Sequence, residues 1–245
     1  MPKERLDKIL LERGLCSSRT RAQALIMSGD VLVADNVCDK AGTRIEIDSE
    51  IHIRGHELAY VSRGGLKLEH ALNTFNLELE GRVAVDVGAS TGGFTDCLLQ
   101  RGVRRVYAVD VGYGQLAWKL REDSRVVNME RTNIRDLSMG IFEPSPDLAV
   151  IDASFISLGK VLPPTLEVLQ PRADIVALVK PQFEVGKGKV GKGGIVRDPA
   201  LHQLVIDNVE QCAVNLGLEV VAMCQSPVLG AKGNREFLMH LARRG

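Results

Sequence analysis

Two short runs in the first thirty residues place apolar side chains at the spacing of helices, where residues three or four apart share one face. The two stripes are Leu6, Ile9 and Leu10, then Ala22, Leu25 and Ile26. The first run ends at Gly14, and Ser17 or Ser18 can cap the second, which ends at Gly29. Short β-rich segments follow at 31–33, 44–47 and 51–53. The pattern predicts a small α+β domain spanning residues 1–60.

From residue 82 onward, apolar strands alternate with helical stretches. The strands are expected at 83–87, 106–109, 148–151, 175–179 and 218–223. Such alternation favours a doubly wound, mostly parallel α/β sheet. The last predicted strand pair, 220–225 and 236–241, flanks a glycine-rich turn at 230–233. A closing hairpin of this kind is typical of the methyltransferase version of the Rossmann architecture, so residues 61–245 are expected to form a Rossmann-like, class I methyltransferase domain with a mostly parallel seven-stranded sheet.

Composition agrees with an ordinary soluble protein of one large and one small domain, since 45% of the 245 residues are hydrophobic and 25% are charged. The formal net charge is zero, but it is unevenly distributed. Residues 1–29 carry six Lys or Arg against three Asp or Glu, and residues 30–60 carry three against seven. This segregation suits a protein with one basic face, although a solvated helix surface would look the same.

Targeting and metal signals are missing from the sequence. The five cysteines have no zinc-ligand spacing, and we expect no metal. No apolar core follows the charged start of the chain, and no apolar stretch approaches the 20 or so residues of a membrane span. We therefore expect a cytoplasmic protein that does not enter a membrane.

A glycine-rich turn follows the first strand of the larger domain. Glycines let the backbone turn tightly and bring a ligand close to a helix N-terminus. The spacing fits neither a dinucleotide fingerprint nor a P-loop. Asp110 ends the second strand, where a carboxylate can accept both hydroxyls of an adenosine ribose, and Asn133 is placed to meet the adenine edge. The expected cofactor-binding residues are Asp86, Gly88, Ala89, Ser90, Thr91, Gly92, Gly93, Asp110, Val111 and Asn133.

Four further polar residues are expected at the same rim of the sheet. Asp152 ends the fourth strand and Lys180 ends the fifth, and ligands of open α/β sheets bind beyond such ends. Lys67 lies on a predicted helix, and Glu236 begins the final strand. Each alone reads as a surface charge. Together they favour deprotonation of a hydroxyl, in which a lysine acts as base.

The chemistry explains this combination. A ribose hydroxyl must lose its proton as it attacks a sulfonium methyl group. A lysine can accept that proton only if its pKa falls well below about 10.4, which burial or a second cation achieves. We expect Lys180 to be the base and Lys67 the second cation, which also favours the developing alkoxide. Asp152 and Glu236 would orient the two lysines.

Residues 62–245 resemble the FtsJ family of ribose 2′-O-methyltransferases, whose Lys-Asp-Lys-Glu tetrad falls on Lys67, Asp152, Lys180 and Glu236. The whole chain is similar to the TlyA family, also called hemolysin A. Arg5-Leu6-Asp7-Lys8, Gly14-Leu15, Ser18-Arg19 and the segment 29–33 resemble the small αL RNA-binding domain of a ribosomal small-subunit protein.

The resemblance implies a function. Members of the TlyA family use S-adenosylmethionine and methylate cytidine riboses of ribosomal RNA. This methylation can sensitise bacteria to capreomycin and viomycin. The shorter form of the family is associated with large-subunit RNA, which we favour here because this chain has little extension at either end. The expected partners are ribosomal RNA or ribosomal subunits, with no membrane and no obligate protein partner.

Basic residues predict where RNA binds. Clustered cations hold phosphates without reading sequence. A glycine- and lysine-rich segment after the fifth strand is expected to close over the RNA, and the target nucleotide must leave its stack. The expected RNA-binding residues are Lys3, Arg5, Lys8, Arg13, Arg19 and Arg21 on the two N-terminal helices, with Lys187, Lys189 and Lys192 in the loop.

Three other functions agree less well with the sequence. A non-catalytic RNA-binding or ribosome-assembly protein would have no need of all four polar residues. A membrane-lytic hemolysin would need a pore-forming or membrane-spanning segment. A base methyltransferase acting on amino groups often has prolines after the fourth strand, whereas this chain has Asp152-Ala153-Ser154-Phe155 there.

Overall fold

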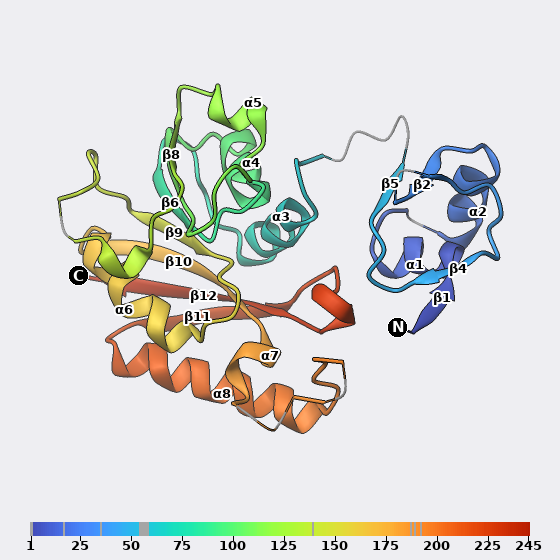
Figure 1. Cartoon of the computed structure of the whole chain (residues 1–245). Coiled ribbons are helices and arrows are strands. Elements are labelled where there is room, and N and C mark those ends of the chain that lie inside the picture. The colour runs from blue at the N-terminus through green and yellow to red at the C-terminus, as the bar shows by residue number, and fades with distance from the viewer. Residues whose placement is uncertain are drawn as a thin grey trace.

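The structure is a computed structural model that describes residues 2–245 except 17, 35, 54–58, 139, 187, 189 and 192. Figure 1 shows two helices and short strands at the N-terminal end of the chain, followed by a larger α/β part. The N-terminal elements are β1 (Lys3–Arg5), α1 (Leu6–Glu12), α2 (Arg19–Met27), β2 (Val31–Val33), β3 (Asn36–Val37), β4 (Arg44–Glu46) and β5 (Ile51–Ile53). Strand β1 pairs with β4, and β2 lies between β3 and β5.

The helical stripes of the N-terminal part are buried as predicted. Their six side chains pack with Val31 and Ile45 into one apolar cluster. Ser18 caps α2, its hydroxyl accepting a hydrogen bond from the backbone N–H of Arg21, while residue 17, the alternative cap, lies outside the described residues. The placement of Lys3 and Arg5 on a helix was wrong, because both lie in β1. Arg13 follows α1 as its C-cap.

The larger part is built on a seven-stranded sheet. Its strands are β6 (Val83–Val87), β7 (Arg105–Val109), β8 (Val126–Met129), β9 (Leu148–Ile151), β10 (Arg172–Val179), β11 (Glu219–Gln225) and β12 (Phe237–Arg244). They lie in the order β11-β12-β10-β9-β6-β7-β8, and only β12 runs antiparallel to its neighbours. The predicted closing hairpin is therefore confirmed, and Glu236 lies directly before its second strand.

Helices cover both faces of this sheet (Figure 1). The α-helices are α3 (Gly64–Phe75), α4 (Gly93–Gln100), α5 (Trp118–Arg121), α6 (Leu158–Val168), α7 (Pro181–Glu184) and α8 (Pro199–Asn215), with 3₁₀ turns η1 (Ile134–Asp136) and η2 (Ala231–Gly233). One apolar cluster joins α3 and α4 to the sheet, and a second joins α6 and α8 to its other face. The parallel strands β6 and β9 are neighbours, and the order in which strands follow one another reverses between them, since β7 and β8 lie on one side and β9 and β10 on the other. Ligands of open α/β sheets bind at such a switch point.

Candidate active site

The ends of β6 and β9 approach closely at this switch point. Val87 and Ile151 are paired in register, so Gly88 and Asp152 follow at the same edge. Gly88 has φ +89°, and a Cβ there would lie 2.8 Å from the carbonyl oxygen of Asp152. Only glycine tolerates both the left-handed backbone and the missing space. Gly88 therefore allows the ends of β6 and β9 to approach closely at the edge where the predicted site residues lie.

A cavity of about 490 Å³ lies beyond β6, β7 and β9. Asp110 and Asn133 are both on its wall, with Val111, Gly88 and Ser90. The Asp110 carboxylate accepts backbone hydrogen bonds from Ser90 at 2.7 Å and Gly112 at 2.6 Å, which fixes its position. A carboxylate has further lone pairs for ligand hydroxyls. The Asn133 side chain accepts a hydrogen bond from Arg135 N and so caps η1.

Asp86 occupies a different position from the other predicted cofactor residues. It lies beneath the glycine-rich turn, fully buried, and accepts a 2.7 Å hydrogen bond from the Thr95 hydroxyl. Burial raises the pKa of Asp86 to about 7, and the charges of Asp152 and Asp110 add to the effect. Asp86 thus lies under the glycine-rich turn and bonds to Thr95. Ala89, Ser90, Thr91 and Gly93 line this cavity or a smaller one beside it.

A second cavity of about 270 Å³ shares Gly88, Ser90 and Asp152 with the first, and Lys67 lines it. Lys67 Nζ lies 2.6 Å from Glu236 Oε2, with 11% and 2% of these side chains exposed. Gly230 makes room for this carboxylate, because a Cβ at position 230 would overlap Glu236. The helix α3 and the turn before β12 are thereby joined by one buried ion pair.

Lys180 forms the other pair. It follows β10 directly and is 8% exposed. Its Nζ lies 2.5 Å from Asp152 Oδ1 and donates a 2.8 Å hydrogen bond to the Ser154 hydroxyl. Sequence reasoning did not identify Ser154, although it stands two residues after a predicted site aspartate. The structure brings the two predicted lysines and two predicted carboxylates together as matched pairs at one edge of the sheet.

An aromatic residue beside this pair also escaped the sequence reasoning. Phe155 follows Ser154 with 91% of its surface exposed and a positive φ of 64°. Its ring lies 5.1 Å from that of Phe183, which is tilted against it. An exposed phenylalanine held in a left-handed conformation is uncommon and often marks a functional position. The signal available in the sequence was an aromatic residue close behind a strand-end aspartate.

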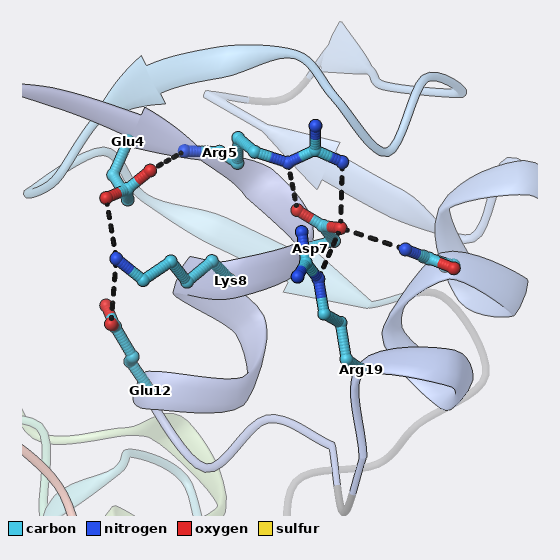
Figure 2. Close-up of polar contacts among 7 residues, drawn as sticks. Glu4, Arg5, Asp7, Lys8, Glu12 and Arg19 are labelled. Atoms are coloured by element: carbon cyan, nitrogen blue, oxygen red, sulfur yellow. Dashed lines mark hydrogen bonds and ion pairs between the residues drawn. The ribbon is translucent and has the colours of Figure 1, made fainter.

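The basic residues of the N-terminal part differ in how freely they meet solvent. Lys8 lies between Glu4, at 2.8 Å, and Glu12, at 3.6 Å, as Figure 2 shows. The Arg13 guanidinium donates to the carbonyls of Ser49 and Ile47, and burial lowers the pKa of Arg13 to about 10.

The remaining predicted RNA-binding residues fall into three groups. Arg5 and Arg19 both reach Asp7. Lys3 and Arg21 are exposed. Lys187, Lys189 and Lys192 lie outside the described residues.

Two features of the described part of the chain bear on other functions. No group of three His, Cys, Asp or Glu side chains gathers there as a metal site would require. None of the helices in that part has the length and apolar character needed to cross a membrane.

The fold and this edge define a class of protein. A model of the FtsJ-like methyltransferase family matches residues 60–243, and a model of the S4 domain matches residues 4–51. The first match covers most of the chain, so the chain belongs to the FtsJ-like methyltransferases. The predicted fold class is confirmed.

Similarity to individual proteins shows which family within the FtsJ-like methyltransferases the chain belongs to. The chain is 50% identical to a Bacillus subtilis protein named as a candidate rRNA methyltransferase, YqxC, covering 98% of this chain and 85% of that one. It is 47% identical to the 16S/23S rRNA (cytidine-2′-O)-methyltransferase TlyA of Mycobacterium tuberculosis, covering 97% and 89%. A solved structure from Streptococcus thermophilus, described as a candidate hemolysin, is 46% identical with a TM-score of 0.78 and covers 99% and 89%. The chain therefore belongs to the TlyA family, as predicted.

Proposed function

We propose that this protein transfers a methyl group from S-adenosylmethionine to the ribose 2′-hydroxyl of a cytidine in bacterial ribosomal RNA. The observation that carries the proposal is the two lysine–carboxylate pairs, each with one buried and one partly exposed member, at the switch point of an FtsJ-like methyltransferase fold. In this proposal residues 1–60 bind the RNA and residues 61–245 catalyse. Large-subunit RNA is the first substrate to test, and small-subunit RNA is the second, since the Mycobacterium tuberculosis relative is named for both.

The larger cavity fits S-adenosylmethionine. Its volume of about 490 Å³ is in the range of small-molecule sites, and its wall offers a fixed carboxylate at Asp110 and an apolar surface at Val111 and Ile134. Asp110 would accept the ribose hydroxyls, and Asn133 would contact the adenine edge. When bound, the cofactor supplies an electrophilic methyl group on a sulfonium.

The two ion pairs would divide the work on the hydroxyl. Lys180 Nζ, when unprotonated, would accept the proton of the 2′-hydroxyl as its oxygen attacks; the cofactor would supply the methyl group and leave as the neutral thioether when the methyl–sulfur bond breaks. Asp152 and Ser154 hold that nitrogen in place. Lys67 supplies positive charge for the developing alkoxide, and Glu236 orients it. Positioned proton transfer contributes roughly 10²–10⁴ in rate, and removal of a preorganised charge stabiliser costs about 10²–10³.

RNA would be held by the basic residues of the N-terminal part. Arg5, Arg19, Lys3 and Arg21 keep N–H groups near solvent, whereas Lys8 already meets two carboxylates. Arg13 already donates to two carbonyls, so its contribution to RNA affinity is expected to be the smallest. We keep Lys187, Lys189 and Lys192 as proposed contacts of the loop beyond Lys180. Exposed Phe155 offers a surface on which the displaced base can stack.

The test is transfer of labelled methyl from S-adenosylmethionine to unmodified 50S and 30S subunits and to their naked RNAs. Wild type is compared with Lys180→Ala and with Lys160→Ala, a matched change of an exposed lysine on α6. We expect label on one or more cytidine riboses, mapped by resistance of the adjacent linkage to alkaline hydrolysis, and its loss in Lys180→Ala alone. Cofactor binding without transfer to any of these RNAs would instead indicate a non-catalytic RNA-binding protein.

A further inference from the structure

The buried carboxylate of Asp7 lies between the side chains of Arg5 and Arg19 in the N-terminal part (Figure 2). Asp7 stands in the first turn of α1, and its side chain has no exposed surface. Its Oδ1 accepts from Arg5 Nε, and its Oδ2 accepts from Arg5 Nη2, Arg19 Nε and Gln23 Nε2, each at 3.0 Å. One carboxylate therefore joins β1, α1 and α2.

The single negative charge of Asp7 faces two positive charges, those of Arg5 and Arg19. Hydrogen bonds from Arg5, together with those from Gln23 and Arg19, hold the pKa of Asp7 well below its usual 3.8, so it remains ionised at neutral pH. Two guanidinium groups meet this single carboxylate, which leaves one net positive charge at the surface. A buried carboxylate without such partners would be strongly destabilising.

The outer edges of both guanidinium groups face solvent. The Arg5 side chain is 41% exposed and the Arg19 side chain is 54% exposed. Within the described part of the chain, Arg19 reaches Asp7 through Nε alone, and Arg5 does so through Nε and Nη2. Nη1 of Arg5 and both Nη groups of Arg19 can therefore donate to phosphate oxygens, for which the planar guanidinium is well suited.

We propose that Asp7 is a positioning residue for RNA binding, and that it holds Arg5 and Arg19 as a fixed pair whose outer N–H groups contact backbone phosphates. The proposal rests on the proposed function, since it assumes that this surface binds RNA. Two long side chains that are already ordered lose less rotamer entropy on binding. Asp7 would thus strengthen RNA binding although its own charge repels phosphate.

Asp7 would strengthen RNA binding by positioning the arginines and weaken it by repelling phosphate. Because these two effects have opposite signs, Asp7→Asn distinguishes between them. If net charge alone governed binding, removal of a carboxylate would tighten RNA binding, most of all at low salt. If the fixed position of Arg5 and Arg19 governs binding, loss of the carboxylate that holds them should weaken RNA binding. The matched control is Glu12→Gln, which removes an exposed carboxylate from the same helix. Affinity for unmodified 23S rRNA is measured at several salt concentrations. We expect about tenfold weaker binding for Asp7→Asn and unchanged or tighter binding for Glu12→Gln.

A mutant cycle tests whether the effect of Asp7 on RNA binding acts through the two arginines. In the Arg5→Ala/Arg19→Ala background, Asp7→Asn should change RNA affinity by less than twofold, because the groups it positions are gone. Methyl transfer by Asp7→Asn should show a raised KM for RNA with kcat and cofactor affinity retained. Arg19→Lys gives an independent variant that keeps the charge but loses the fork, and it should bind RNA almost as weakly as Arg19→Ala.

The outcomes are distinguishable. Equal or tighter binding by Asp7→Asn, or wild-type binding by Arg19→Lys, while Arg19→Ala weakens binding, would overturn the positioning role and leave the RNA-binding surface intact. Unchanged affinity in Arg5→Ala/Arg19→Ala would show that this surface does not bind RNA, and the proposal on that part of the function would fail with it.

Discussion

The buried carboxyl of Asp86 makes the stability of the catalytic part depend on pH. Its pKa is raised from 3.8 to about 7 in the folded chain, chiefly by burial. Folding therefore favours the protonated form. The stabilisation that this group contributes is complete below pH 3.8, falls as pH rises, and is lost above pH 7. A difference of about three units corresponds to at most about 4 kcal/mol in the free energy of unfolding.

The perturbation that isolates this contribution is Asp86→Asn. The asparagine keeps an oxygen for the Thr95 hydroxyl but cannot ionise. Between pH 5 and pH 8 the wild type should lose about 3 kcal/mol of unfolding free energy relative to the variant, at 1.4 kcal/mol per unit up to the folded pKa. Urea denaturation at pH 5, 6, 7 and 8, followed by circular dichroism, measures this difference.

The control is Asp207→Asn, which changes an exposed carboxyl on α8. Its difference from wild type should stay flat over the same range. A flat difference for Asp86→Asn as well would refute the reasoning, because it would show that Asp86 ionises equally well in the folded and unfolded chain. A difference of the opposite slope would mean that the folded site favours the carboxylate.

Three further predictions concern the site. Glu236→Ala leaves the Lys67 ammonium buried without its carboxylate and should cost about 3–5 kcal/mol in urea denaturation, whereas Lys67→Met/Glu236→Leu should recover much of that loss. Gly230→Ala forces the carboxylate of Glu236 from its place and should abolish most methyl transfer while calorimetry shows unchanged cofactor affinity. Phe155→Ala should raise the KM for RNA several-fold with little change in kcat, and an unchanged KM would exclude base stacking on this ring.

Much of the fold was predictable because burial leaves a periodic trace in the sequence. The stripes of α1 and α2 each bury one face in one apolar cluster, and the apolar strand β9 buries its two faces in two clusters on either side of the sheet. Strand β1 was missed because Lys3, Glu4 and Arg5 are all charged and alternate in no apolar pattern. Its assignment depends on backbone pairing with β4, about forty residues later.

The site was less accessible to sequence reasoning, because its geometry depends on distant partners. Lys67 and Glu236 are 169 residues apart, and neither the predicted positions nor the resemblance indicated which lysine pairs with which carboxylate. The sequence also shows that Arg13 is basic but not that two carbonyls occupy its guanidinium. In the sequence, Asp7 is an ordinary acidic residue in the first turn of a predicted helix. Only the fold places Arg19, from the next helix, against its carboxylate.

Strand β12 links the integrity of the sheet to that of the candidate active site. It follows the other six strands of the sheet in the sequence, yet it lies between β10 and β11, and Glu236 directly precedes it. Without this segment, β11 has no partner in the sheet, and the Lys67 ammonium lacks its carboxylate. The sheet and the candidate active site therefore depend on the same segment, so a chain cut before Glu236 would lose both the partner of β11 and the carboxylate that pairs with Lys67.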